Sequence, residues 1–375
     1  MFRLSLSVLP LVLLAACGSE RANISATGPA AATRFLTGED DPGYTHVFSS
    51  RPFEFPEDHG SHPEYRSEWW YFTGNLSADN DRQFGFELTF FRFALSPQQP
   101  ERISAWGTNQ AWMAHLSLTD EQADRFVAAE RLSREALGLA GNELDPFALR
   151  LEDWSVASDG PEFFPLELTA GADDGEISLT LTALKDPVSH GEDGFDRKGP
   201  EPGNASHYYS ITRLQATGRI RVGQRESHVT GLAWMDREWG TSALGSDLAG
   251  WDWFSLQLSD GRDLMYYRLR TDQGRTSPFS GGSIVAADGR RTALGPGDVS
   301  LTILDYWQSA ASGARYPVSW ALTVPEEHLN IELRPLIPRQ ELDLTVRYWE
   351  GAVVATGIGE SLGLGGRGYL ELTGY

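Results

Sequence analysis

The stretch around residue 236 combines acids and tryptophans in a spacing suited to acid catalysis. Trp234, Asp236 and Glu238 are two residues apart, so on a β-strand they share one face. A carboxyl group among aromatic rings is desolvated, which raises its pKa, and an acid still protonated near neutral pH can donate a proton. Aromatic faces also stabilise positive charge. These residue types therefore fit acid catalysis in which a proton is donated and positive charge develops beside aromatic rings.

Carboxylates stand beside tryptophans at two other points. Glu68 lies two residues before Trp70, and Asp252 lies between Trp251 and Trp253. One interpretation places Glu68, Trp70, Trp251, Trp253 and Glu238 around a bound ligand. The alternative is structural, because carboxylates near tryptophan often accept indole or backbone hydrogen bonds, or pair with arginine.

Several other chemistries are disfavoured by the sequence. There is no Gly-x-Ser-x-Gly nucleophile elbow, no phosphate loop and no dinucleotide fingerprint. The eight histidines are scattered; His59 and His62 are three apart, but in a loop that contains Pro and Gly. The sequence therefore predicts neither a metal nor another cofactor.

The N-terminus has the layout of a secretory signal. A basic start is followed by an apolar run, Leu4–Leu14, of about eleven residues, whereas a membrane-spanning helix needs roughly 20. Leu14-Ala15-Ala16-Cys17 resembles a bacterial lipobox, in which the cysteine is acylated. Cys17 is the only cysteine, so it forms no internal disulfide. We therefore predict a signal peptide over residues 1–16, lipidation at Cys17 and a flexible tether over residues 17–43.

The predicted location is the cell envelope, at the periplasmic face of the outer membrane. The residue after the lipidated cysteine is Gly18 and not an acidic residue, which by resemblance to known lipoprotein sorting rules favours the outer membrane. The net charge of −21 disfavours nucleic acid and anionic lipid headgroups as partners. Membrane association is therefore expected through the lipid anchor only. Twelve tryptophans favour a thick sheet-on-sheet core or a cavity for an apolar ligand.

Most of the chain alternates apolar and polar residues with the period of a β-strand. Such segments are Phe84–Phe90, Ile177–Thr182, Val299–Ile303, Val318–Val324 and Leu342–Tyr348. Turn pairs separate them, at Asp79-Asn80, Asp173-Asp174, Asp260-Gly261 and Asp288-Gly289. Only Glu121–Leu137 has helical spacing. The predicted fold class is all-β, a sandwich or barrel.

Several aromatic stretches carry a family resemblance. They are His62–Gly74, His207–Ser210, Gly231–Gly240, Gly250–Trp253, Tyr348–Gly351 and Gly368–Tyr375. Together they resemble the family of acyclic-carotenoid hydratases (hydroxyneurosporene synthase) and AttH-type secreted proteins, with the AttH-type branch closer. The resemblance implies two lipocalin-like antiparallel β-barrels, here residues 44–240 and 241–375.

The resemblance also implies functional roles. Asp236 occupies the position of the hydratase acid, with His207 and Tyr209 upstream of it; we expect a cavity lined by Trp234, Tyr209 and Trp251, with His207 close by. An enzyme of hydratase or hydrolase type, acting on an apolar or amphipathic molecule, is one reading. A non-enzymatic carrier working with ABC-transporter components, as implied by AttH-type relatives, is another, and a ligand-free structural protein is a third.

Cys17→Ser is expected to abolish lipid anchoring, because the thiol is the acceptor for the lipid and several acyl chains exceed the two-signal minimum for stable attachment. The mutant should stay unprocessed or appear in the aqueous phase after detergent partitioning of cell extracts. Equal partitioning of mutant and wild type into the detergent phase contradicts the prediction.

Overall fold

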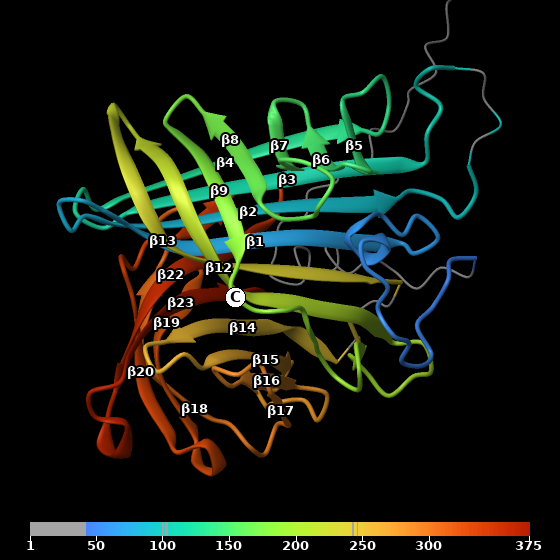
Figure 1. The fold of residues 1–375 in the computed structure, drawn as a ribbon. Helices are drawn as coiled ribbons and strands as arrows, with labels where there is room; N and C mark the ends of the chain where they lie inside the picture. Colours follow the sequence, from blue (N-terminus) through green and yellow to red (C-terminus); the bar gives the residue numbers. More distant parts are fainter. Residues whose placement is uncertain (1–42, 100, 102–103, 242–243, 246) are drawn as a thin grey trace, which may run out of the picture.

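The computed structural model describes residues 43–99, 101, 104–241, 244–245 and 247–375, and shows two large antiparallel sheets lying one over the other (Figure 1). The predicted signal peptide, Cys17 and the tether up to residue 42 lie outside this range. Within it there is no α-helix, and the only helical turns are η1 (Glu57–His59), η2 (Pro325–Glu327) and η3 (Gly359–Ser361). No helix in the described ranges is long and apolar enough to span a bilayer. The prediction of an all-β, two-domain lipocalin-like fold is confirmed.

The first sheet contains thirteen strands in the order β4-β3-β2-β1-β13-β12-β9-β8-β7-β6-β5, with β10 and β11 added to β12. Their bounds are β1 (Ser67–Ala78), β2 (Gln83–Ala94), β3 (Gln110–Asp120), β4 (Arg125–Arg134), β5 (Ala140–Leu144), β6 (Phe147–Leu151), β7 (Trp154–Ser158), β8 (Leu166–Ala172), β9 (Gly175–Ala183), β10 (Val188–Ser189), β11 (Phe195–Arg197), β12 (Ala205–Val222) and β13 (Arg225–Gly240).

The second sheet contains ten strands in the order β17-β16-β15-β14-β23-β22-β20-β19-β18, with β21 paired to β22. Their bounds are β14 (Leu248–Leu258), β15 (Asp263–Thr271), β16 (Gly281–Val285), β17 (Arg291–Leu294), β18 (Ser300–Gln308), β19 (Arg315–Val324), β20 (Leu329–Pro335), β21 (Glu341–Asp343), β22 (Arg347–Gly357) and β23 (Gly365–Leu372). The chain passes from one sheet to the other between Gly240 and Leu248.

The central strands of both sheets are buried on their two faces. One face of β1 points into the core of the first sheet, where Trp70 and Phe72 are fully buried. The opposite face of the same strand carries Trp69 and Tyr71, which pack against side chains of the second sheet. Adjacent residues of a strand therefore enter different environments, the interior of one curled sheet or the layer between the two.

The predicted strands around Phe84–Phe90, Ile177–Thr182, Val299–Ile303 and Val318–Val324 are confirmed as β2, β9, β18 and β19. Each predicted turn pair joins two neighbouring strands: Asp79-Asn80 joins β1 to β2, Asp173-Asp174 joins β8 to β9, Asp260-Gly261 joins β14 to β15, and Asp288-Gly289 joins β16 to β17. Alternation within each strand and the residue types of each turn agree here, so the sequence pattern was sufficient to locate these strands and turns.

The predicted helix over Glu121–Leu137 is wrong, because most of this segment forms β4, paired along its whole length with β3. Val127 and Ala129 pack on the core of the first sheet, whereas Phe126 and Ala128 pack on the layer between the sheets. Since both faces are covered, the apolar residues are consecutive instead of alternating. Tertiary pairing therefore overrode a composition that favours helix.

The predicted single strand over Leu342–Tyr348 is also wrong in part. Its ends belong to β21 and β22, which pair as a tight hairpin with Leu342 opposite Tyr348. The alternation nevertheless continues through the turn because Leu342, Val346 and Tyr348 all pack into one apolar cluster. Period-two spacing therefore reflected shared burial instead of one continuous strand.

Asp263 links the two sheets through buried charges. This β15 carboxylate accepts hydrogen bonds from Thr212 Oγ1 (2.8 Å) and Arg213 Nη2 (2.6 Å) of β12, and lies 2.7 Å from Lys185 Nζ. Its side chain is fully buried. Removing one partner of a buried ion pair leaves the other charges without compensation, which destabilises strongly.

Asp263→Ala should therefore lower the free energy of unfolding by about 3–5 kcal/mol, as measured by urea denaturation. The control is Asp343→Ala, which breaks the exposed pair with Arg347 and should cost less than about 1 kcal/mol. A loss in Asp263→Ala no larger than the control loss would show that this cluster does not hold the sheets together.

Candidate functional site

A cavity of about 120 Å³ lies between the two sheets. Its first wall comes from β1, β2, β12 and β13, and its second wall from β14, β15, β22 and β23. Most of the lining is aromatic or aliphatic, but one basic and three acidic side chains, Lys198, Asp236, Glu238 and Glu371, also face it. The lining residues are Ser67, Trp69, Tyr71, Thr89, Phe91, Lys198, Ser206, Tyr208, Asp236, Glu238, Gly240, Leu244, Trp251, Trp253, Tyr267, Leu269, Tyr348 and Glu371.

Asp236 is held in the first wall by neutral donors. Its Oδ2 accepts a hydrogen bond from the Tyr208 hydroxyl (2.6 Å), and its Oδ1 accepts bonds from Trp234 Nε1 (2.6 Å) and the Ser210 hydroxyl. Burial raises the pKa of Asp236 to about 7, although the three donors favour the ionised form and oppose this shift. Asp236 therefore exchanges its proton near neutral pH, as a general acid requires.

Glu238 lies on the same face of β13 but has a cationic partner. Its Oε1 accepts a hydrogen bond from the Ser206 hydroxyl (2.5 Å) and lies 3.2 Å from Lys198 Nζ, which also pairs with Asp196 at 2.6 Å. The ammonium group sits 4.2 Å from the centre of the Tyr267 ring. Burial raises the pKa of Glu238, while Lys198 opposes that rise.

Glu371 approaches the cavity from the second wall. Its Oε1 accepts a hydrogen bond from Trp251 Nε1 (2.8 Å), and burial raises its pKa to about 8. Behind it, the Tyr71 hydroxyl donates to Glu350 Oε1 (2.6 Å), and burial raises the pKa of Glu350 well above its usual value. The cavity thus has carboxyl groups on both walls whose proton affinities are raised by desolvation.

Trp234, Asp236 and Glu238 share one face of β13, and Asp236 and Glu238 line the cavity. The expectation that Trp234 lines the cavity is wrong, because its indole lies behind the wall and donates to Asp236. Trp251 and Trp253 line the opposite wall of the cavity. On the other face of β13, Met235 and Trp239 belong to the core of the first sheet.

The expectation that His207 and Tyr209 face this cavity is wrong. Both lie on the opposite face of β12, where their rings pack against Trp239 in the first core at centroid distances of 5.5 Å and 6.3 Å. Burial lowers the pKa of His207 to about 4, so it is neutral at pH 7. The side chains that reach Asp236 are their neighbours Tyr208 and Ser210. Adjacent residues of a strand point to opposite faces, so an error of one residue selects the wrong face. Only the pairing of β12 with β13 shows which residues of β12 face the cavity.

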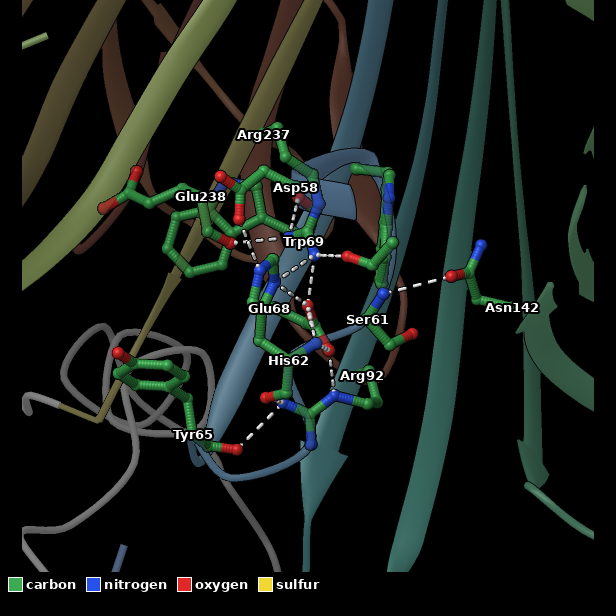
Figure 2. Close-up of polar contacts among 12 residues, drawn as sticks. Asp58, Ser61, His62, Tyr65, Glu68, Trp69, Arg92, Asn142, Arg237 and Glu238 are labelled. Atoms are coloured by element: carbon green, nitrogen blue, oxygen red, sulfur yellow. Dashed lines mark hydrogen bonds and ion pairs between the residues drawn. The ribbon is translucent and has the colours of Figure 1, made fainter. Parts of the chain in front are cut away.

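Glu68 and Trp70 were also expected at the ligand, and the structure places both outside the cavity. Trp70 stacks on Trp112 in the first core at 5.5 Å. Glu68 lies in a buried polar cluster (Figure 2), where it pairs with Arg92 and Arg237 and accepts the backbone N–H of His62 at 3.0 Å. Trp69 and Tyr71, which alternate with them, face the cavity instead.

The polar cluster around Glu68 holds the first residues of β1 in place. Burial alone would raise the pKa of Glu68, but the adjacent guanidinium groups of Arg92 and Arg237 outweigh it and hold that pKa well below its usual range. The guanidinium of Arg237 also lies 3.8 Å from the centre of the Trp70 ring, and His62 stacks on Trp239 at 4.0 Å. Asp252 has a similar structural role, paired with Arg268 at 2.6 Å.

A metal site is not supported by the side chains present. Among residues 43–375, apart from the six positions left undescribed, no group of three or more His, Cys, Asp or Glu side chains could hold an ion. His59, which precedes His62 by three residues, is instead stacked on Phe163 at 3.5 Å and bonded to the Tyr209 hydroxyl at 2.7 Å.

The fold and cavity define a class of protein: two lipocalin-like sheets that enclose an acid-lined aromatic cavity between them. The sequence matches the AttH-like family over residues 46–375, so the chain belongs to that family. A solved AttH-type protein from Nitrosomonas europaea is 34% identical, with a TM-score of 0.78 over 88% of this chain and 99% of its own.

A second similar structure is kievitone hydratase from Nectria haematococca, with a TM-score of 0.64 over 88% of this chain and 98% of its own. Its identity is 14%, so this likeness concerns the fold alone. Among curated proteins, none matches the chain.

Glu68 and Asp236 should give opposite pH dependences of stability. The folded-state pKa of Glu68 is depressed, so its contribution is present above about pH 4.3, its unfolded pKa, and is lost on acidification. The pKa of Asp236 is raised to about 7, so wild type loses stability as pH rises from about 4 towards 7. Relative to wild type, Glu68→Gln should be most destabilised at neutral pH, and Asp236→Asn should become more favourable as pH rises. Urea unfolding at several pH values checks both, and parallel curves for the two mutants would contradict the assignment.

Proposed function

We propose that this protein binds an apolar or amphipathic small molecule between its two sheets and hydrates an alkene in it, with Asp236 as the acid. The observation that carries the proposal is a buried carboxyl group, held only by neutral donors, in the wall of an aromatic cavity. Its pKa near 7 is suited to donating a proton at physiological pH.

The chemistry follows from the groups around the cavity. The Asp236 O–H protonates one alkene carbon, and the π electrons form the new C–H bond, which leaves a tertiary cation at the other carbon. The rings of Trp251, Trp253 and Tyr71 line this space and stabilise the cation. A water molecule then adds to the cation, and the proton that it loses restores the acid form of Asp236.

The cavity walls support an apolar or amphipathic ligand. Aromatic and aliphatic side chains supply most of the contact surface. The ion pair of Lys198 with Glu238 makes one part of the wall polar, which suits a molecule with one polar end. Held at the cell envelope through Cys17, as we propose from the N-terminal sequence, the protein would meet such molecules at a membrane surface.

A serine-hydrolase mechanism is less well supported. Ser210 does contact a histidine, with its hydroxyl 2.6 Å from His190 Nε2. However, Ser210 is fully buried, does not line the cavity and directs its hydroxyl to Asp236. It therefore has no access to a bound ester. A pure carrier function would not need a proton-exchanging acid at the ligand, so Asp236 favours the enzyme over the carrier.

Asp236→Asn should abolish hydration while preserving folding and ligand binding, because asparagine keeps the size of the side chain but has no acidic proton. The test incubates the purified protein with acyclic isoprenoid alkenes in ¹⁸O-labelled water and follows the label in the alcohol by mass spectrometry. Binding is followed separately by quenching of tryptophan fluorescence, since Trp251 and Trp253 line the cavity.

Asp252→Asn is the matched control, because this aspartate pairs with Arg268 and does not line the cavity. It should lower stability and leave the labelling rate of the folded protein unchanged. Labelled product from Asp236→Asn at the wild-type rate would overturn the proposed function.

A further inference from the structure

A continuous hydrogen-bonded chain leads away from Asp236 on the side opposite the ligand. Asp236 Oδ1 is bonded to the Ser210 hydroxyl, which lies 2.6 Å from His190 Nε2; the other ring nitrogen, Nδ1, lies 3.2 Å from the Ser283 hydroxyl of the second sheet. All four side chains are almost completely buried. None of the proposed chemical steps uses Ser210, His190 or Ser283, so the purpose of this chain is unexplained by them.

The chain depends on an excursion between β9 and β12. Residues of β10 and β11 fold back onto β12, with Val188 opposite Ser210, and the His190 N–H bonds the Tyr208 carbonyl oxygen at 2.9 Å. A tight turn closes the excursion at Gly191, whose φ is 60° and where a Cβ would lie 2.2 Å from the Phe195 carbonyl oxygen. The backbone therefore fixes His190 behind Ser210.

A protonated Asp236 needs an acceptor for its own O–H. Trp234 Nε1 can only donate. The Tyr208 hydroxyl already accepts a bond from Trp253 Nε1 (3.1 Å), so its own proton is directed to Asp236. Ser210 differs, because a hydroxyl can donate and accept, and His190 behind it can accept at Nε2 or donate from it according to its tautomer. Ser210 can therefore reverse its hydrogen bond.

We propose that His190, acting through Ser210, holds Asp236 in its acid form and is a positioning residue for the proton donor. In the resting acid form, Asp236 donates to Ser210, Ser210 donates to His190 Nε2, and His190 carries its proton on Nδ1 and donates to Ser283. The Asp236 O–H turns from Ser210 towards the cavity when it protonates the alkene. When Asp236 loses its proton to water during a titration, every bond reverses, and exchange with water removes the imidazole proton from Nδ1 and places one on Nε2. The imidazole stays neutral in both states, so the chain adds no second charge beside the carboxyl group of Asp236.

The surrounding charges agree with a neutral ring. Burial, followed by the nearby cations Arg291 and Lys198, lowers the pKa of His190 well below its usual value. The Tyr208 ring packs on the imidazole at 4.5 Å. The titratable groups that face Asp236 are Tyr208, Glu238 and, from the opposite wall, Glu371.

This inference rests on the proposed role of Asp236 as acid, but its test needs no turnover. The full protein is labelled with ¹³C at aspartate carboxyls and ¹⁵N at histidine rings, and both are followed by NMR during a pH titration, with Asp236→Asn and His190→Gln used for assignment. In wild type, the Asp236 signal should titrate near pH 7. The two His190 nitrogens should exchange their protonated and unprotonated shifts with the same midpoint. His190 shifts that stay constant while Asp236 titrates would overturn the proposal.

Two substitutions at position 190 separate this role from packing. His190→Leu removes the acceptor behind Ser210, so accepting from Asp236 would leave the Ser210 proton without a partner. Donation to an ionised Asp236 is then favoured, which should lower the Asp236 midpoint by about one pKa unit, the effect of one hydrogen bond. His190→Gln keeps an acceptor and should restore a midpoint close to wild type. If the Asp236 titration midpoint is the same in folded His190→Leu, His190→Gln and wild-type proteins, the inference is contradicted.

Hydration activity provides a separate readout. If Asp236 is the acid, activity falls as pH rises through its pKa, and His190→Leu moves that fall to lower pH. Coupled titrations of Asp236 and His190 without any ¹⁸O incorporation would contradict the proposed function and support the coupling of His190 to Asp236. Incorporation of ¹⁸O with uncoupled titrations would support the proposed function and contradict the coupling.

Discussion

Strand β13 is buried on both faces, and the rest of the site depends on this constraint. Arg237 points into the first sheet, where it meets Glu68, while Asp236 and Glu238 on either side of it point into the layer between the sheets. The Glu68–Arg237 pair runs diagonally across β1 and β13, since Glu68 lies opposite Trp239 and Arg237 lies opposite Trp70. Any slip of this register would move a buried arginine into the cavity and an acid into an apolar core.

The same kind of side chain behaves differently on these two faces. Glu68 has two guanidinium partners and stays ionised despite complete burial. Asp236 is equally buried but has only hydroxyl and indole donors, so desolvation dominates and its pKa rises to about 7. Neutral donors orient a carboxyl group without fixing its charge. The environment therefore separates a structural acid from one able to exchange a proton.

The position of the cavity follows from how each sheet is filled. Tryptophans and aliphatic side chains occupy the interior of both curled sheets, including Trp70, Trp112 and Trp154 in the first and Trp320 and Trp349 in the second. The cavity instead forms where the sheets meet, and residues from eight strands contribute to it. Its shape and its proton affinities thus depend on contacts between sheets, such as Trp253 to Tyr208 and Tyr71 to Glu350.

The sequence by itself determined the all-β class and the hairpin turns, because period-two alternation and turn residues are local signals. It also placed Trp234, Asp236 and Glu238 on one face, since alternation within a strand needs no partner. It could not phase β12 against β13, so nothing in it corrected the choice of His207 and Tyr209, which the resemblance implied, to Tyr208 and Ser210. It failed for β4 as well, where both faces are covered and alternation disappears. Only the tertiary structure decided which face of each strand lines the cavity and brought His190 behind Asp236, because strand register and the stacking of sheets arise from contacts between residues far apart in the chain.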